Sequence, residues 1–322
     1  MTATAIGALA NQMGIAIGFF LCPTLVPDGS DGQAITNLLL LMSILGLSSF
    51  LLTGLFRSKP PSPPSRSAEA QNHAESEKGS KDSGAMFFFT GIPKLFRNPG
   101  YTNLCLSFGI NVGCFYVVTT LLSQMLIELN YSSQATALIG TLIVVVGIVG
   151  AFLFGLLADR TQKPKLLLII CMVGTCLSLA FWTACFQENQ IYLLSFGACL
   201  LGFFMTALLP ISMDVAVSIS FPLPESLSSN VLLACAQLWG IFLVSLCTPL
   251  LAYFSILSVN LTVLAISVIP AISMFFFKGK NKRQMLEHTF KQSPSELEGA
   301  FESIQAPDKT TLLLRSPNRE QE

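Results

Sequence analysis

Charged side chains are scarce in this chain. Lysine, arginine, aspartate and glutamate together make up 11% of its 322 residues, less than half of the roughly 25% typical of soluble domains. Apolar residues make up 52%, and a soluble fold could not keep so many apolar segments away from water. No cluster of basic residues marks one folded face, so the composition excludes a nucleic-acid-binding protein.

Side chains that commonly take part in catalysis or metal binding are also scarce. The chain has two histidines, His73 and His288, and both lie outside the apolar segments. Its nine cysteines show neither a CxxC pair nor a metal-binding Cys/His spacing. Most of them fall inside apolar segments, where cysteine behaves as a small hydrophobe. No nucleophile with a neighbouring base and no glycine-rich phosphate loop is evident. We therefore expect no enzymatic activity, no bound metal and no cofactor.

Lysine and arginine are missing over long distances, and their positions are informative. All 18 fall in three stretches, 57–97, 160–165 and 278–319. Basic residues therefore follow only every second apolar segment, which is the positive-inside pattern of an α-helical membrane protein. Each apolar segment is long enough for a membrane span of about 20 residues. The sequence predicts an all-α, multi-pass helical bundle with eight spans, at 2–22, 34–56, 101–127, 136–158, 166–186, 191–212, 228–254 and 257–277.

The same charges predict sidedness. They place the linker 57–100 and the tail after residue 277 in the cytosol, and the chain then starts on the cytosolic side. A signal peptide is excluded, because a basic n-region and a small-residue cleavage site are both missing. The plasma membrane is favoured over an endolysosomal membrane, although 308–313 has the acidic-x-x-x-Leu-Leu form of an endolysosomal sorting signal. Two glycosylation sequons, at Asn130 and Asn260, lie so close to spans that we expect neither to be modified.

The linker divides the spans into unequal groups, with two helices in 1–56 and a six-helix bundle in 101–277. Most of the linker 57–100 is rich in proline, serine and other polar residues and is expected to be disordered. Its last part, 85–99, mixes phenylalanine with basic residues and is expected to lie along the membrane surface. The polar tail 278–322 is expected to be disordered as well.

A charged motif after the fourth span resembles an element of the major facilitator superfamily. It reads Gly155-Leu-Leu-Ala-Asp159-Arg160-Thr-Gln-Lys163-Pro-Lys165 and is similar to that superfamily's G-x-x-x-D-R-x-x-[RK]-x-[RK] loop. A simple charged turn is the alternative interpretation. Six helices after a long cytosolic linker also match the second half of the superfamily's twelve-helix plan. The resemblance implies that these charges lock neighbouring helices in one gating state.

Three further stretches narrow the resemblance to the feline leukaemia virus subgroup C receptor-related transporters, which carry choline, ethanolamine or haem. The stretches resemble that family's fifth, seventh and tenth helices, in matching order, and are 11–27, 113–125 and 213–225. The resemblance covers about residues 2–277. It departs from the usual family residues at Asp214, Ser218 and Phe221. It also implies that the chain begins inside the fifth helix, so we expect an N-terminally truncated transporter.

Polar side chains inside a span are costly in hydrocarbon and are therefore candidates for function. Gln12 and Gln237 lie well inside the first and seventh spans, and the resemblance implies that both line the central cavity. Tyr116 lies too deep in the third span for an interfacial aromatic, within the stretch that resembles the family's cation-binding segment. An aromatic face beside neutral acceptors suits a desolvated ammonium group. We expect Gln12, Tyr116 and Gln237 to bind the substrate.

Other residues of the spans have structural or gating interpretations. Asn111 is expected to hydrogen-bond a neighbouring helix, Gln124 to meet headgroups or water, and Trp239 to pack. Four glycines of the fourth span are expected to permit close helix approach, namely Gly140, Gly147, Gly150 and Gly155. Asp214 and Glu225 are expected to bracket a cytosolic loop. The gating residues that we predict are Gly155, Asp159, Arg160 and Asp214.

Two functions are consistent with these features. The first is transport of a small organic cation, choline or ethanolamine before haem, by alternating access of two helix bundles. The second is a non-transporting, truncated product that modulates a full-length protein. The implied partners are a small-molecule substrate and bilayer lipids, and the oligomeric state is open.

Overall fold

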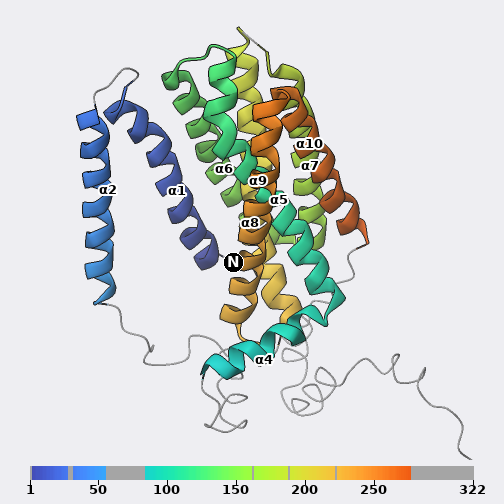
Figure 1. Ribbon diagram of the computed structural model, residues 1–322. Coiled ribbons are helices and arrows are strands. Elements are labelled where there is room, and N and C mark those ends of the chain that lie inside the picture. The colour runs from blue at the N-terminus through green and yellow to red at the C-terminus, as the bar shows by residue number, and fades with distance from the viewer. Residues whose placement is uncertain are drawn as a thin grey trace, which may run out of the picture.

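The computed structural model describes residues 2–27, 32–55, 84–161, 163–187, 189–221 and 223–276, with side chains from residue 10 in the first helix and from residue 90 in the linker helix. All regular structure in these residues is helical, which confirms the predicted all-α class (Figure 1). The helices are α1 (Thr2–Leu25), α2 (Gly32–Thr53), α4 (Gly84–Phe96), α5 (Pro99–Glu128), α6 (Ser133–Thr161), α7 (Pro164–Cys185), α8 (Ile191–Ser220), α9 (Glu225–Tyr253) and α10 (Ile256–Phe275). The predicted disordered part of the linker and the predicted tail lie almost entirely outside the described residues.

Seven of the described helices, α2 and α5 to α10, are long and apolar enough to cross a membrane. The remaining predicted span, the first in the chain, corresponds to α1, whose fully described part, Ala10–Leu25, is a shorter apolar helix. Several helices extend beyond the predicted spans, because a helix does not have to end where the hydrocarbon ends. The largest extension is in α8, which was expected to end at residue 212 and continues to Ser220. It stops before Pro222, since the residue preceding a proline favours extended backbone, and Phe221 has φ −50° and ψ 135°.

Helices α5 to α10 form one bundle, and α6 packs most closely on α8. Glycines explain this close approach. A Cβ at Gly150 would overlap the carbonyl oxygen of Phe203, and a Cβ at Gly202 would overlap that of Ile143. Gly140 and Gly147 also pack against other helices, which confirms three of the four predicted close-approach glycines. The prediction for Gly155 is wrong, because a Cβ there would meet nothing within 4 Å.

Helix α5 is tied to its neighbours by polar contacts at its first residues. Asn98 caps the helix by accepting a hydrogen bond from Gly100 N at 3.1 Å, and its Nδ2 donates to the carbonyl of Ile219 at 3.1 Å. The hydroxyl of Tyr101 donates to the carbonyl of Ser228 on α9 at 2.6 Å. These bonds join α5 to the end of α8 and the start of α9, and so fix the helix that carries Tyr116.

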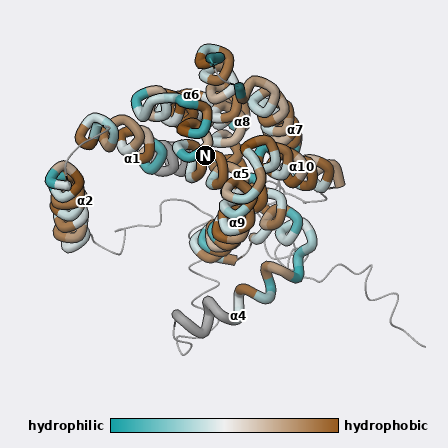
Figure 2. Tube along the Cα trace, turned by 45° about the horizontal axis from the view of Figure 1, so that its top comes forward, coloured by the Kyte–Doolittle hydropathy of each residue, from teal (hydrophilic) through white to brown (hydrophobic). Residues whose placement is uncertain are grey.

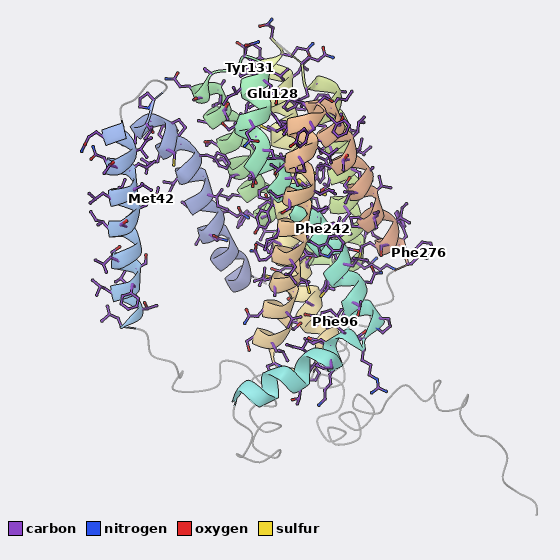
Figure 3. The ribbon with its side chains drawn as sticks, viewed as in Figure 1. Met42, Phe96, Glu128, Tyr131, Phe242 and Phe276 are labelled. Carbon is purple, nitrogen blue, oxygen red and sulfur yellow. The ribbon has the colours of Figure 1, made fainter. Side chains whose placement is uncertain are left out.

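The two ends of the bundle differ in charge. The basic end holds Lys94, Arg97, Arg160, Lys163 and Lys165. The Tyr131 end holds Glu128 and Tyr131 (Figure 3). Helix α4 crosses the basic end beneath α5 and α9 (Figure 1). It is held there by Leu95, which is fully buried, and by Gly91, where a Cβ would overlap the side chain of Leu227.

Helices α1 and α2 stand beside this bundle (Figure 1). Helix α1 packs against α6, where Phe19 covers Gly140. Helix α2 is apolar along its length, as its colouring in Figure 2 shows, and none of its residues is buried. A helix that is apolar all round requires lipid or further protein around it.

Candidate functional site

The structure brings together Tyr116 and Gln237, which are 121 residues apart in the sequence. Gln237 Nε2 on α9 donates a hydrogen bond of 3.0 Å to the hydroxyl of Tyr116 on α5. The aromatic ring lies against Gly240, one turn further along α9, where an added Cβ would overlap Cδ2 of the ring and lie 3.0 Å from Cε2. Gly240 therefore makes room for the ring, and Gln237 orients its hydroxyl group.

A cavity of about 590 Å³ lies between α1, α2, α5 and α6, in the half of the protein towards the Tyr131 end. Two residues of α5 line it, Thr119 and Ser123. They are three and seven residues beyond Tyr116, so all three lie on one face of the helix. Tyr116 therefore lies one turn below the α5 lining, on the side nearer to the basic end.

Gln12 lies one turn below the cavity lining of α1, as Tyr116 lies one turn below the cavity lining of α5. Ile15 and Phe19 line the same cavity, and they are three and seven residues beyond Gln12, again on one helix face. Because α1 and α5 both run from the basic end to the Tyr131 end, Gln12 and Tyr116 lie at similar depth. The side chain of Gln12 is 9% exposed, and its Oε1 is buried without a hydrogen-bond partner. Unpaired amide oxygens are costly in such surroundings, so this oxygen is available to a ligand or to water.

One further polar residue at this depth was missed by the sequence analysis. Thr206 on α8 is 4% exposed, and its Oγ1 has no hydrogen-bond partner. It projects towards Gly147 of α6, where a Cβ would overlap the hydroxyl. A threonine within an apolar helix usually bonds a carbonyl one turn back, so nothing in the sequence separates Thr206 from other helical threonines.

Trp239 and Asn111 lie in different surroundings. Trp239 packs as expected, with its ring against Gly109 and its backbone against Gly113 of α5. The Nδ2 of Asn111 is buried without a hydrogen-bond partner, so this nitrogen does not make the predicted hydrogen bond to a neighbouring helix.

The predicted gating residues lie towards the basic end but do not share one environment. Asp159 and Arg160 are exposed in the last turn of α6. Gly155 lies one turn earlier, beside open space. Asp214 does not begin a loop, as expected, but is half-buried within α8, which continues to Ser220. The prediction failed because it ended the helix after the number of residues that is needed to cross the hydrocarbon layer.

In the part of the chain that the structure describes, no three His, Cys, Asp or Glu side chains are grouped so as to hold a metal ion.

Comparisons with known proteins agree with this architecture. The profile of the Major Facilitator Superfamily matches residues 104–317. The choline/ethanolamine transporter flvcr2a of Danio rerio is 30% identical over 289 residues, which are 88% of this chain and 60% of that protein. Human choline/ethanolamine transporter FLVCR2 is 31% identical over 74% of this chain and 45% of its own length. Mouse FLVCR1, also named a choline/ethanolamine transporter, is 35% identical over 75% of this chain and 45% of its own length.

The chain thus spans about half the length of the curated relatives that it matches. The family match, residues 104–317, begins within α5 and includes α6 to α10. This is a superfamily of transporters and not of enzymes. The chain belongs to the Major Facilitator Superfamily and is related to the FLVCR choline/ethanolamine transporters.

Proposed function

We propose that this protein takes part in transport of a small organic cation, choline or ethanolamine, across a membrane by alternating access. The observation that supports this most strongly is the Tyr116–Gln237 pair, joined by a hydrogen bond of 3.0 Å, on the helix face that continues into the cavity beside α1. In transporters, substrate sites lie near the bilayer midplane between two helix groups. Gln12 lies at similar depth on the other group.

The chemistry of this site suits a cation that has lost its water. The face of the Tyr116 ring attracts an ammonium group, with a free energy of about 1–2 kcal/mol when the site is desolvated. The oxygens of Gln12 and Gln237 are neutral acceptors, so they can solvate the cation or accept from its hydroxyl group. The lysines and arginines of the described residues all lie at the basic end. An organic cation at this depth therefore meets no like charge.

Haem suits the same cavity less well. Its iron requires an axial ligand and its propionates require cationic partners. The cavity lining includes the thiol of Cys22 but no histidine, lysine or arginine. The names of these relatives, choline/ethanolamine transporters, also favour choline or ethanolamine over haem.

Opening and closing of the transporter would involve the basic end of the bundle. We propose that Asp159 and Arg160 at the end of α6, together with Gly155 and Asp214, stabilise one state of the transporter there. The positive-inside pattern supports a cytosolic location for this end. By the same reasoning the linker and the tail face the cytosol, and the plasma membrane is the proposed location.

The test is uptake of radiolabelled choline and ethanolamine by cells that express the chain, with its level at the membrane measured in parallel. Tyr116→Ala should raise the apparent KM about tenfold, the equivalent of 1–2 kcal/mol. Tyr116→Phe should have a much smaller effect, because the ring face remains and the exposed Gln237 can bond water. Unchanged KM in both variants would show that the cation is bound elsewhere. Uptake of haem alone, or no uptake with the chain present in the membrane, would favour the haem and non-transporting alternatives respectively.

A further inference from the structure

A second cavity, of about 340 Å³, lies at the Tyr131 end, away from α1 and α2. It is enclosed by the end of α5, the end of α7 and the turn between α9 and α10. Its polar lining consists of Glu128, Thr183, Ser255 and Asn260, and its aromatic lining consists of Phe186 and Phe254. Neither the proposed transport site nor the gating residues contribute to it.

One wall of this cavity attracts positive charge. Glu128 is the last residue of α5, where the helix dipole is negative and a carboxylate is unfavourable unless a cation is nearby. The described residues around this end include no lysine or arginine that could supply that cation. The exposed carboxylate and the end of α5 together favour a cationic group.

The opposite wall attracts an acceptor. It is formed by the first residues of α10, where the helix dipole is positive. Asn260 lies in the second turn of this helix, is 4% exposed, and its Nδ2 is buried without a hydrogen-bond partner. An amide donor buried in this way costs free energy until an acceptor reaches it. Asn260 and Glu128 both line the cavity.

The rim of the cavity is apolar and lies where helices α5, α7 and α9 end and α10 begins. Phe254 and Leu257 line the cavity and are 76% and 56% exposed, and the neighbouring Tyr253 is also exposed. Aromatic residues gather at the height of the lipid headgroups. Figure 3 shows Glu128 and Tyr131 together at this end of the bundle. Phe186 is held in place by Trp182, with ring centroids 5.2 Å apart.

We propose that this cavity binds a zwitterionic phosphoethanolamine group, supplied by phosphatidylethanolamine of the surrounding leaflet. The ammonium lies against Glu128 and the end of α5. A phosphate oxygen accepts from Asn260 Nδ2 at the start of α10. The acyl chains leave over Phe254 and Leu257. Free phosphoethanolamine carries the same two charges at the same spacing and is the other possible source of the group.

The experiment is reconstitution of the 322-residue chain into nanodiscs of phosphatidylglycerol with a minor fraction of phosphatidylethanolamine, followed by native mass spectrometry of the retained lipid. Wild type should retain phosphatidylethanolamine above its fraction in the disc. Glu128→Gln and Asn260→Leu should each lower that enrichment at least fivefold, whereas Glu128→Asp, which keeps the charge, should stay within about twofold. Glu128 is exposed, so its variants keep the test valid even if Asn260→Leu folds poorly.

Competition with free phosphoethanolamine distinguishes the two sources. If the lipid is the ligand, millimolar phosphoethanolamine should leave its enrichment unchanged. If free phosphoethanolamine displaces the lipid from wild type but does not bind to Glu128→Gln, the cavity does bind a phosphoethanolamine group. The natural ligand is then the soluble compound and not the lipid. The proposal would be overturned if both lipids were retained in proportion to their fractions in the disc. Equal enrichment of phosphatidylethanolamine in wild type and Glu128→Gln would also overturn it.

Discussion

Gly240→Ala should weaken binding of choline or ethanolamine without touching the substrate. The new methyl group would overlap Cδ2 of Tyr116 and lie 3.0 Å from Cε2. Ordinary carbon–carbon contacts are about 3.5–4.0 Å, so the ring must move by roughly 1 Å. That shift carries the hydroxyl away from Gln237 Nε2, now at 3.0 Å, and turns the ring face away from the cation. Loss of about 1–2 kcal/mol of cation–π attraction raises the apparent KM about tenfold.

The assay is concentration-dependent uptake, normalised to the amount of chain in the membrane. Gly46→Ala on α2 is the matched control, because a Cβ there meets nothing within 4 Å. A double-mutant cycle gives the decisive comparison. In a Tyr116→Ala background, Gly240→Ala should have little further effect, because the ring that it displaces is already gone. An equally large effect in both backgrounds would show that Gly240 acts through helix packing and would refute the reasoning.

Three other outcomes can be checked directly. Gly202→Ala places a methyl group on the carbonyl of Ile143, so it should destabilise the protein by about 1–3 kcal/mol or more, seen as a lower melting temperature in detergent. Asn98→Ala removes the cap of α5 and a bond to α8, and should cost about 1–2 kcal/mol in the same assay. Epitope tags at position 75 and after Glu322 should be labelled only after permeabilisation, and labelling of intact cells would contradict the charge-based topology.

Much of the fold could be predicted from the sequence, because each span is a continuous apolar run and each basic stretch marks a turn on one side. The ends of helices were less predictable. Asp214 was assigned to a loop because the hydrocarbon thickness predicted the end of α8 at residue 212, yet the backbone continues helical to Ser220. Only the following prolines end it, and their effect depends on local backbone geometry and not on hydropathy.

The candidate site was only partly predictable. Intramembrane polarity and family resemblance selected Tyr116 and Gln237, but neither could show that one donates to the other or that Gly240 makes room for the ring. Glycines of α6 look alike in the sequence, although Gly150 contacts α8 and Gly155 faces open space. The buried amide of Asn260 was visible only as part of a glycosylation sequon. Such differences arise from which helix lies opposite, and one sequence does not contain that information.

The central claim is that the ring of Tyr116 and the neighbouring amides recognise positive charge. It is tested most directly by comparing inhibition of radiolabelled choline uptake by unlabelled choline and by its neutral carbon isostere, 3,3-dimethylbutan-1-ol, which has the same shape and hydroxyl group. We expect the neutral compound to inhibit at least about tenfold more weakly, since it lacks the cation–π attraction, and we expect this difference to disappear in Tyr116→Ala. Equal inhibition by the two compounds in wild type would contradict the cation site.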